Sequence, residues 1–386
     1  MNHPAVLVLA DGTLFHGTSF GYAHPDAPLF QTAEVVFNTA MTGYQEILTD
    51  PSYAEQMVCL TYPHIGNTGI NFSDNENAAQ KIHAKALIIR ELSLVESNWQ
   101  CKETLDFFLQ INQTPGITGV DTRALTSLIR DKGAQMGCLL IAPILTEAHI
   151  QKALNLAQTT AGLDNLDLAI QVTTPKPYIY ATAKDKMANP TEIVVYDFGV
   201  KQNILRLLAQ RNCTVTVVPA DYPAEKVIEQ MPDGVLLSNG PGDPKACHYA
   251  LNNTKKLLAQ KIPIFGICLG YQILGLSLGA QTLKMKLGHH GANHPVMCRH
   301  SKKVFITSQN HGFAIEESSL PKQLIATHHS LFDGSLQGIK HQTLPVFGFQ
   351  GHPEAAPGPQ EMGVLFEEFF SLVQSYQHYK LTKIMV

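Results

Sequence analysis

The stretch Pro263-Ile264-Phe265-Gly266-Ile267-Cys268-Leu269-Gly270-Tyr271-Gln272-Ile273-Leu274-Gly275 decides the fold of this chain. A short apolar run ends at Cys268, and an apolar run compatible with a helix follows directly. This pattern is typical of a tight strand-to-helix turn that lifts a reactive side chain out of a sheet, with glycine needed on both sides because a Cβ would crowd the turn. A helix beginning after Cys268 would direct its free N–H groups at the sulfur and favour the thiolate. The alternative for this stretch is a buried structural cysteine in a core strand.

Length and composition favour two folded domains. The chain has 386 residues, more than one typical core, and 45% hydrophobic and 16% charged residues argue against extensive disorder. A net charge of −4 gives no reason to expect nucleic acid or an anionic membrane as a partner. The seven cysteines are scattered and odd in number, which predicts free thiols in a reducing compartment. Because no basic leader or long apolar run is present, we expect a cytoplasmic protein.

The second half alternates strand-like and helix-like runs, which predicts an α/β domain with a doubly wound, mostly parallel sheet. The expected strands are 192–198, 214–218, 234–237, 263–268, 303–308, 324–327 and 346–350. The expected helices are 201–211, 224–231, 249–260, a helix after Cys268, and 360–376. Such sheets bind ligands outside the carboxyl ends of their strands, where Cys268 and the turn 239–243 are expected to lie.

The first half predicts a smaller domain of mixed α+β or α/β type with no chemistry of its own. Its expected strands are 6–9, 34–37, 56–61 and 86–90, and its expected helices are 104–110 and 122–131. The stretch 173–191 has three prolines, several lysines and little apolar periodicity, which is typical of a linker. We therefore expect domains over 1–172 and 192–386, joined by 173–191.

A cysteine nucleophile needs a base, and the segment Phe349-Gln350-Gly351-His352-Pro353-Glu354 offers one at the end of an expected strand. His352 would accept the thiol proton, and Glu354 would orient the imidazole and stabilise its charged form. The chain has 17 histidines, and most of them are expected to be surface or core residues. At His352, however, a strand end, a rigid turn and a neighbouring carboxylate coincide. The Leu269 N–H and the turn Gly240-Pro241-Gly242 are candidate oxyanion donors, although that turn also fits a plain strand-to-helix connection.

Three motifs together resemble those of the class I (triad) glutamine amidotransferases. They are GICLG at 266–270, SNGPGDP at 238–244 and GHPE at 351–354. Further motifs resemble the small subunit of carbamoyl phosphate synthetase: FNTAMTGYQEILTDPSY at 37–53, TYPHIGN at 61–67, VDTR at 120–123, GHHGANHP at 288–295, QNHGF at 309–313 and SLFDG at 330–334. The resemblance covers nearly the whole chain.

The resemblance implies hydrolysis of L-glutamine to glutamate and ammonia. It assigns Cys268 as the nucleophile that forms a γ-glutamyl thioester, His352 as base and then acid, and Glu354 as the group that orients His352. It also implies a set of residues that hold the glutamine: Ser52, Gly240, Gly242, Leu269, Gln272, Asn310, Gly312 and Phe313. Because Ser52 belongs to the first domain, this set predicts a site near the interdomain face.

Two features depart from the simplest reading of these motifs. Many members of the family carry histidine where this chain has Tyr271, from which we expect altered reactivity and not loss of it. The cluster His289, His290 and His294 invites a zinc site, but its spacing lacks the paired ligands of known zinc sites, and the family uses no metal here. We expect Cys247 and Cys298 to be packing or surface residues.

The resemblance also implies a partner. The chain lacks a G-x-x-x-x-G-K-[S/T] phosphate loop and the length for a second synthetase domain, so a separate large subunit would bind ATP and Mg²⁺ and make carbamoyl phosphate for arginine and pyrimidine synthesis. We expect a heterodimer, or a higher oligomer of heterodimers, with no metal or cofactor in this subunit. The alternatives are a non-catalytic scaffold with a relic site, and a glutaminase that serves anthranilate or guanylate synthesis.

Overall fold

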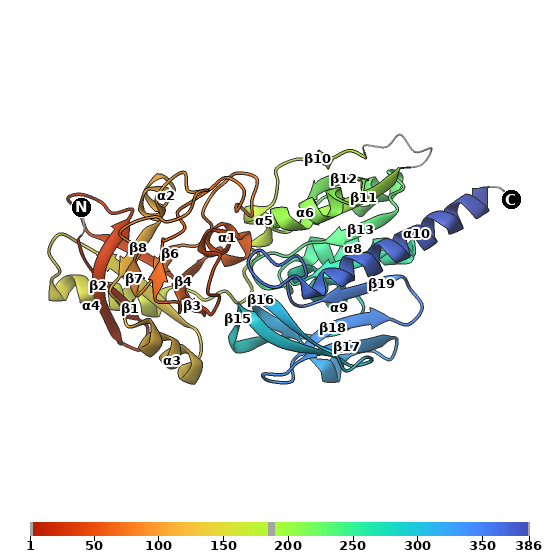
Figure 1. The fold of residues 1–386 in the computed structure, drawn as a ribbon. Coiled ribbons are helices and arrows are strands. Elements are labelled where there is room, and N and C mark those ends of the chain that lie inside the picture. Colours follow the sequence, from red (N-terminus) through yellow and green to blue (C-terminus); the bar gives the residue numbers. More distant parts are fainter. Residues whose placement is uncertain (1–2, 184–189, 385–386) are drawn as a thin grey trace. The chain divides into compact units, whose positions relative to one another are not determined.

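A computed structural model describes residues 3–183 and 190–384 and resolves two compact units (Figure 1). The N-terminal unit is Met1–Asp164 with Lys286–Gly291, and the C-terminal unit is Asn165–Met285 with Ala292–Val386. This division differs from the expected boundary at 172. The expected linker also differs, because Tyr178–Ala181 forms strand β10, which pairs with β12 at the sheet edge. Residues 184–189 of that expected linker lie outside the described residues.

The C-terminal unit is built on a ten-stranded sheet with a parallel centre. Five neighbouring strands run parallel in the order β12-β11-β13-β14-β19. Their bounds are β11 Thr191–Asp197, β12 Cys213–Pro219, β13 Gly234–Leu237, β14 Ile264–Ile267 and β19 Val346–Phe349. The strands are almost wholly buried, as expected for parallel strands covered on both faces. The doubly wound fold predicted from the sequence is therefore confirmed for this part of the sheet.

Helices cover both faces of this parallel centre. They are α5 Ala169–Val172, α6 Gln202–Ala209, α7 Ala224–Glu229, α8 His248–Ala259, α9 Leu269–Ser277 and α10 Val364–Ile384. Alternate residues of β11 enter different cores, since Val195 packs with α6 and α10 whereas Val194 packs with α7, α8 and α9. Within the described ranges, no helix is long and apolar enough to cross a membrane.

Antiparallel strands extend the same sheet beyond β19. They are β15 Thr282–Cys298, β16 Val304–Ile315, β17 Leu324–Ser330 and β18 Leu336–His341. Strand β18 pairs with β19, and β17 pairs with both β18 and β15. The sheet therefore combines the parallel half that the sequence predicts with an antiparallel half that carries the 309–313 motif on β16.

The N-terminal unit contains a seven-stranded sheet that closes on itself in the order β1-β2-β8-β6-β4-β3-β9. The bounds are β1 Pro4–Leu9, β2 Leu14–Gly21, β3 Leu29–Asn38, β4 Gln56–Leu60, β6 Ala86–Ile88, β8 Pro115–Thr118 and β9 Gln135–Ile141. Closure depends on β9, which pairs antiparallel with both β1 and β3. Two short strands, β5 His64–Ile65 and β7 Glu91–Leu92, pair separately.

Four helices complete the N-terminal unit: α1 Tyr44–Thr49, α2 Leu105–Ile111, α3 Thr122–Lys132 and α4 Glu147–Thr159. Side chains of Thr104, Asp121 and Thr146 cap α2, α3 and α4 by accepting a backbone N–H, as their sequence positions favour. The middle of β15 also belongs to this unit, where the Ala134 N–H donates to the Lys286 carbonyl at 3.0 Å. The 288–295 motif is therefore divided between the two units.

The aromatic packing around Phe265 on β14 predicts a large stability effect. Phe265 is fully buried, stacks on Phe347 at 4.5 Å and meets Phe366 edge-on at 5.7 Å between ring centroids. We expect Phe265→Ala to lower the free energy of unfolding by about 3–5 kcal/mol, because it leaves a cavity in a packed core. Urea unfolding followed by circular dichroism measures this loss. Ile179→Ala, at a position that is 64% exposed, is the control and should change the value by less than about 0.5 kcal/mol. Equal effects would contradict the assignment of this core.

Candidate active site

The carboxyl ends of β11, β13, β14 and β19 lie side by side because these four strands are parallel neighbours. Each end continues into a segment with polar or reactive side chains. The side chains are Asp197 at the end of β11 and Lys201 after it, Ser238 and Asn239 after β13, Cys268 after β14, and Gln350, His352 and Glu354 after β19. The sheet edge thus gathers groups that are up to 157 positions apart in the sequence, and such folds bind ligands at this edge.

The turn at Cys268 has the tight geometry that its glycines predict. Cys268 has φ 52° and ψ −106°, and α9 begins at the next residue. A Cβ added to Gly266 would lie 2.6 Å from the Gly270 carbonyl oxygen, and one added to Gly270 would lie 2.1 Å from the Leu237 carbonyl oxygen. Both positions therefore require glycine, and the reactive side chain projects from a strand-to-helix turn.

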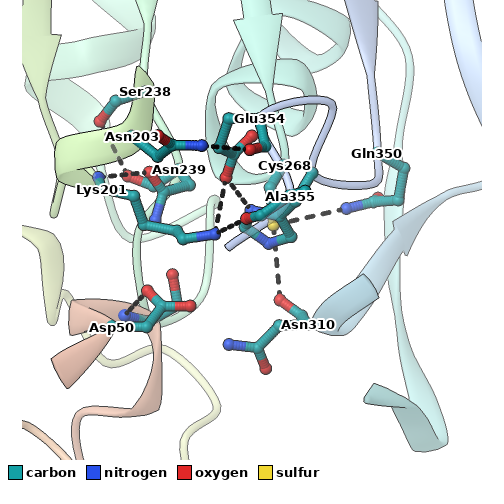
Figure 2. A network of polar contacts seen from close by, with 12 residues as sticks. Asp50, Lys201, Asn203, Ser238, Asn239, Cys268, Asn310, Gln350, Glu354 and Ala355 are labelled. Atoms are coloured by element: carbon teal, nitrogen blue, oxygen red, sulfur yellow. Dashed lines mark hydrogen bonds and ion pairs between the residues drawn. The ribbon is translucent and has the colours of Figure 1, made fainter. Parts of the chain in front are cut away.

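The thiol of Cys268 has two polar neighbours in the C-terminal unit (Figure 2). Its Sγ lies 3.5 Å from the backbone carbonyl oxygen of Asn310, to which a protonated thiol donates. The Nε2 of Gln350 lies 3.8 Å from the same sulfur and donates toward it. Oε1 of Gln350 accepts from Nε2 of Gln272 at 3.1 Å, so this contact fixes which end of the Gln350 amide faces the sulfur. The Asn310 carbonyl can accept a hydrogen bond from a protonated thiol, whereas the Gln350 N–H can donate one to a thiolate.

His352 and Glu354 form a buried ion pair beside the thiol. Nδ1 of His352 lies 2.7 Å from Oε1 of Glu354, and the two side chains are 2% and 0% exposed. Burial opposes the charged imidazole, but the Glu354 carboxylate and the Cys268 side chain outweigh it and raise the pKa of His352. Nε2 of His352 makes no hydrogen bond to another group in the described part of the chain, so it is available to a reacting proton.

The structure adds Lys201, a residue that the sequence reading treated only as the start of a helix. Its side chain is 2% exposed, and Nζ lies 3.0 Å from Oε1 of Glu354 and donates to the carbonyl of Ala355 (Figure 2). Burial would raise the pKa of Glu354, but the charges of Lys201 and His352 overcome it and lower that pKa. Asn203 donates to the Glu354 carbonyl. The position of Lys201 after a buried strand was the available signal, since lysine is rarely buried without a partner.

Gly240, Gly242 and Leu269 lie at the neighbouring turns. A Cβ on Gly240 would be 2.1 Å from the Phe198 carbonyl oxygen and 3.0 Å from the Leu269 side chain, so the residues Gly240 and Leu269 are neighbours. Gly242 has φ 92°. These glycines are thus required by the backbone itself, whatever they bind. Their assignment as ligand-binding residues stays a prediction.

The other predicted substrate residues divide between the two units. Asn310, Gly312 and Phe313 lie on β16, and Nε2 of Gln272 donates to the Phe313 carbonyl at 2.7 Å. They thus belong to the same unit as Cys268. Ser52 lies in the N-terminal unit within the helical turn Pro51–Tyr53, where its N–H donates to Asp50 Oδ1 at 2.9 Å. Its role at the site stays a prediction.

The remaining residues singled out in the sequence have these environments. Tyr271 is fully buried and packs with Ala280, Ile315 and Ile339, and burial raises its pKa. Its influence on reactivity stays a prediction.

The three histidines of the 288–295 motif are divided between the units: His289 and His290 belong to the N-terminal unit and His294 to the C-terminal unit. Over 3–183 and 190–384, no three His, Cys, Asp or Glu side chains are grouped to hold a metal ion.

The raised pKa of His352 makes stability depend on pH. A group whose pKa is higher in the folded state binds its proton more tightly there, so its stabilisation is complete below the unfolded value of about 6.5 and is lost as pH rises above it. We expect the difference in unfolding free energy between the wild type and His352→Gln to decrease above pH ~6.5, by at most about 1.4 kcal/mol per pH unit. Urea unfolding from pH 6 to 9 measures it. A difference that is constant or grows with pH would contradict the ion pair.

The Gln350 contact predicts a change in thiol reactivity. Gln350→Leu removes an N–H donor aimed at the sulfur, and the thiolate is the form that alkylating agents attack. We expect iodoacetamide to modify Cys268 about tenfold more slowly, corresponding to a hydrogen bond of about 1.4 kcal/mol. Quantitative peptide mapping separates Cys268 from the other cysteines.

Gln337→Leu is the matched control for this measurement. Gln337 is equally buried and its backbone carbonyl accepts the Gln350 N–H, but its side chain donates to Ser335 at 3.2 Å. The control should leave the alkylation rate of Cys268 unchanged. If both leucine variants slow the reaction equally, general loosening of the strands explains the effect and the Gln350 contact does not.

Comparison with known proteins places these features in a family. Residues 194–372 match the family model "Glutamine amidotransferase class-I", and residues 7–139 match "Carbamoyl-phosphate synthase small chain, CPSase domain". Proteins named "Carbamoyl phosphate synthase small chain" from Thioalkalivibrio sulfidiphilus and Pseudomonas aeruginosa are each 52% identical to it, over 96% of this chain and 97% and 98% of theirs. The protein of that name from Vibrio cholerae is 51% identical over 98% of this chain and all of its own length. This chain belongs to the carbamoyl phosphate synthase small-chain family.

Proposed function

We propose that this chain hydrolyses L-glutamine and supplies the ammonia to a carbamoyl phosphate synthase large chain. The observation that carries this proposal is the meeting of Cys268, His352 and Glu354 at adjoining ends of parallel strands. A strained turn presents the sulfur, and a buried carboxylate holds the imidazole whose Nε2 has no other partner among the described residues. This is the arrangement that nucleophilic catalysis on an amide needs.

In the first half-reaction, the Cys268 sulfur attacks the side-chain amide carbon of glutamine while His352 takes the thiol proton. The resulting oxyanion lies at the backbone N–H groups of Leu269 and Gly240, two donors of the kind that stabilise such intermediates. His352 then gives its proton to the nitrogen, the C–N bond breaks, and ammonia leaves. A γ-glutamyl thioester remains on Cys268.

In the second half-reaction, His352 removes a proton from water, and the hydroxyl attacks the thioester carbon. The C–S bond breaks, the sulfur leaves with its electron pair and regains a proton from His352, and glutamate is released. Glu354 keeps the imidazole in one orientation and stabilises its charged form in both halves. Lys201 neutralises the carboxylate, so that Glu354 is held in place without an unpaired buried charge.

Glutamine is a zwitterion, so its binding needs small donors and acceptors at backbone distance. The residues proposed to bind it would offer backbone N–H and C=O groups or hydroxyl and amide side chains: Ser52, Gly240, Gly242, Leu269, Gln272, Asn310, Gly312 and Phe313. A Cβ built on Gly312 meets no atom within 4 Å, which leaves space for a ligand beside β16.

The ammonia passes to a large chain that makes carbamoyl phosphate from bicarbonate and ATP for arginine and pyrimidine synthesis. We place ATP and Mg²⁺ in that large chain and no metal or cofactor in this one. The two chains form a heterodimer or a higher oligomer of heterodimers in the cytoplasm. The free cysteines of this chain support a reducing compartment.

Cys268→Ser tests this division of labour. In the complex reconstituted with the large chain, we expect the variant to lose glutamine-dependent synthesis of carbamoyl phosphate by at least 10³-fold, because a serine hydroxyl lacks the nucleophilicity of the thiolate. Synthesis from added ammonium chloride should remain at the wild-type rate, since the large chain carries that reaction. Loss of both activities would contradict the proposal.

The same preparation distinguishes the scaffold alternative. Wild-type complex quenched with acid during turnover of radiolabelled glutamine should carry label on the Cys268 peptide, and Cys268→Ser should carry none. An unlabelled wild-type complex that still makes carbamoyl phosphate from ammonia would favour a non-catalytic scaffold.

A further inference from the structure

The segment that follows β7 displays large apolar side chains on the surface of the N-terminal unit. Leu94 is 97% exposed, Val95 is 67% exposed and Trp99 is 89% exposed, all within six positions. Single exposed apolar residues are common, but a run of them that includes tryptophan is typical of a surface that binds another protein. Trp99 is also the only tryptophan of the chain.

The backbone beneath these side chains is held in place. The Ser93 N–H donates to the Ile65 carbonyl at 2.7 Å, the Ser97 N–H donates to the Asn67 carbonyl at 2.7 Å, and the Lys102 N–H donates to the Ile70 carbonyl at 2.8 Å. Hydrogen bonds therefore anchor the segment at both ends and near its middle. A fixed segment loses little conformational entropy on binding, so its apolar side chains can contribute fully to affinity.

A small hollow adjoins this segment. Its volume is about 110 Å³, and Met41, Tyr44, Ile65 and Asn67 are among the residues that line it. Ile65 and Asn67 are the residues that anchor the segment, and Met41 is 71% exposed. The residues that anchor the segment therefore also line a recess, a kind of relief that protein interfaces use for shape complementarity.

We propose that the surface formed by Met41, Leu94, Val95 and Trp99, here called the indole surface, docks onto the large chain of the synthase. This inference rests on the proposed function, which requires a second chain to receive the ammonia. The indole surface lies within residues 7–139, the part that matches the small-chain model, and outside residues 194–372, the part that matches glutamine amidotransferases in general. It therefore belongs to the part that distinguishes this family from other glutaminases.

Area and charge fit a protein partner. Four side chains of this size and exposure offer on the order of 500 Å² of apolar surface, a large share of the roughly 800 Å² that one partner buries in a standard interface. Exposed Arg90, Glu91 and Lys102 flank the segment and carry both signs of charge. An apolar centre with a mixed polar rim is the usual anatomy of a protein interface, whereas an anionic membrane would favour a basic rim.

The single tryptophan makes a direct test possible. Full-length protein is produced with 5-hydroxytryptophan at position 99, so that its emission can be excited apart from that of any tryptophan in the large chain. Adding the large chain should shift this emission to shorter wavelength and reduce its quenching by acrylamide. If size exclusion shows a complex while emission and quenching stay unchanged, the proposal is overturned.

Variants measure the contribution to affinity. Trp99→Ala should weaken binding of the large chain at least tenfold, Trp99→Phe should restore most of the affinity, and Leu94→Ala should weaken binding severalfold. Ile144→Ala, 74% exposed in the same unit, is the control and should bind as the wild type does. These positions are exposed, so unfolding should be unaffected.

The outcomes separate this inference from the proposed function. A wild-type chain that fails to bind the large chain at all contradicts the proposed function, and the inference with it. If the wild type binds the large chain and the Trp99→Ala variant binds it equally well, the inference alone is contradicted. If Trp99→Ala instead dissociates a dimer of this chain and leaves affinity for the large chain unchanged, the indole surface joins two copies and the proposal is overturned.

Discussion

Between β14 and α9 the backbone turns at Cys268 with φ 52°, a conformation that costs a non-glycine residue of the order of 1–3 kcal/mol. The surrounding structure holds it there. The Cys268 N–H donates to the Phe349 carbonyl at 2.9 Å, and the Gly270 N–H donates to the Ser238 carbonyl at 2.9 Å. The turn is thus tied to the ends of β19 and β13, the two strands that flank β14. Any change that moved the turn would also move the segments that carry His352 and Asn239.

The charged side chains beside Cys268 form a buried chain in which the Glu354 carboxylate contacts both Lys201 and His352. Lys201 and Glu354 are buried and of opposite sign, so together they contribute no net charge. His352 contacts the same carboxylate oxygen through Nδ1 at 2.7 Å, and Glu354 and Cys268 raise the pKa of His352 although burial opposes its charged form. Buried charges persist where they are paired and hydrogen-bonded, and here each has a partner of opposite sign. The Lys201 contact therefore does more than hold Glu354. It also compensates the charge of the buried carboxylate that orients His352.

The sequence predicts what is local in this fold and misses what depends on distant pairing. Strand β13 was expected at its observed bounds, and the elbow and the His352–Glu354 pair followed from residue spacing within short motifs. Lys201 and Gln350 were not assigned roles, because each acquires its partner through the alignment of β11 and β19 with β14. Closure of the N-terminal sheet was also missed, since it depends on β9 pairing with strands more than 90 positions earlier. Alternating strands and helices predict a parallel sheet, but which strands become neighbours leaves no periodic signal in the chain itself.

The division into two units separates two kinds of constraint. The contacts described around Cys268 lie in the C-terminal unit, whose residues match a model shared by glutamine amidotransferases of many kinds. Such a site fixes the reaction but leaves open which synthase receives the ammonia. The N-terminal unit carries the small-chain match and the indole surface, where exposed apolar groups have no evident role in folding. Because exposed side chains contribute little to stability, that surface can vary without disturbing the buried charges around Cys268.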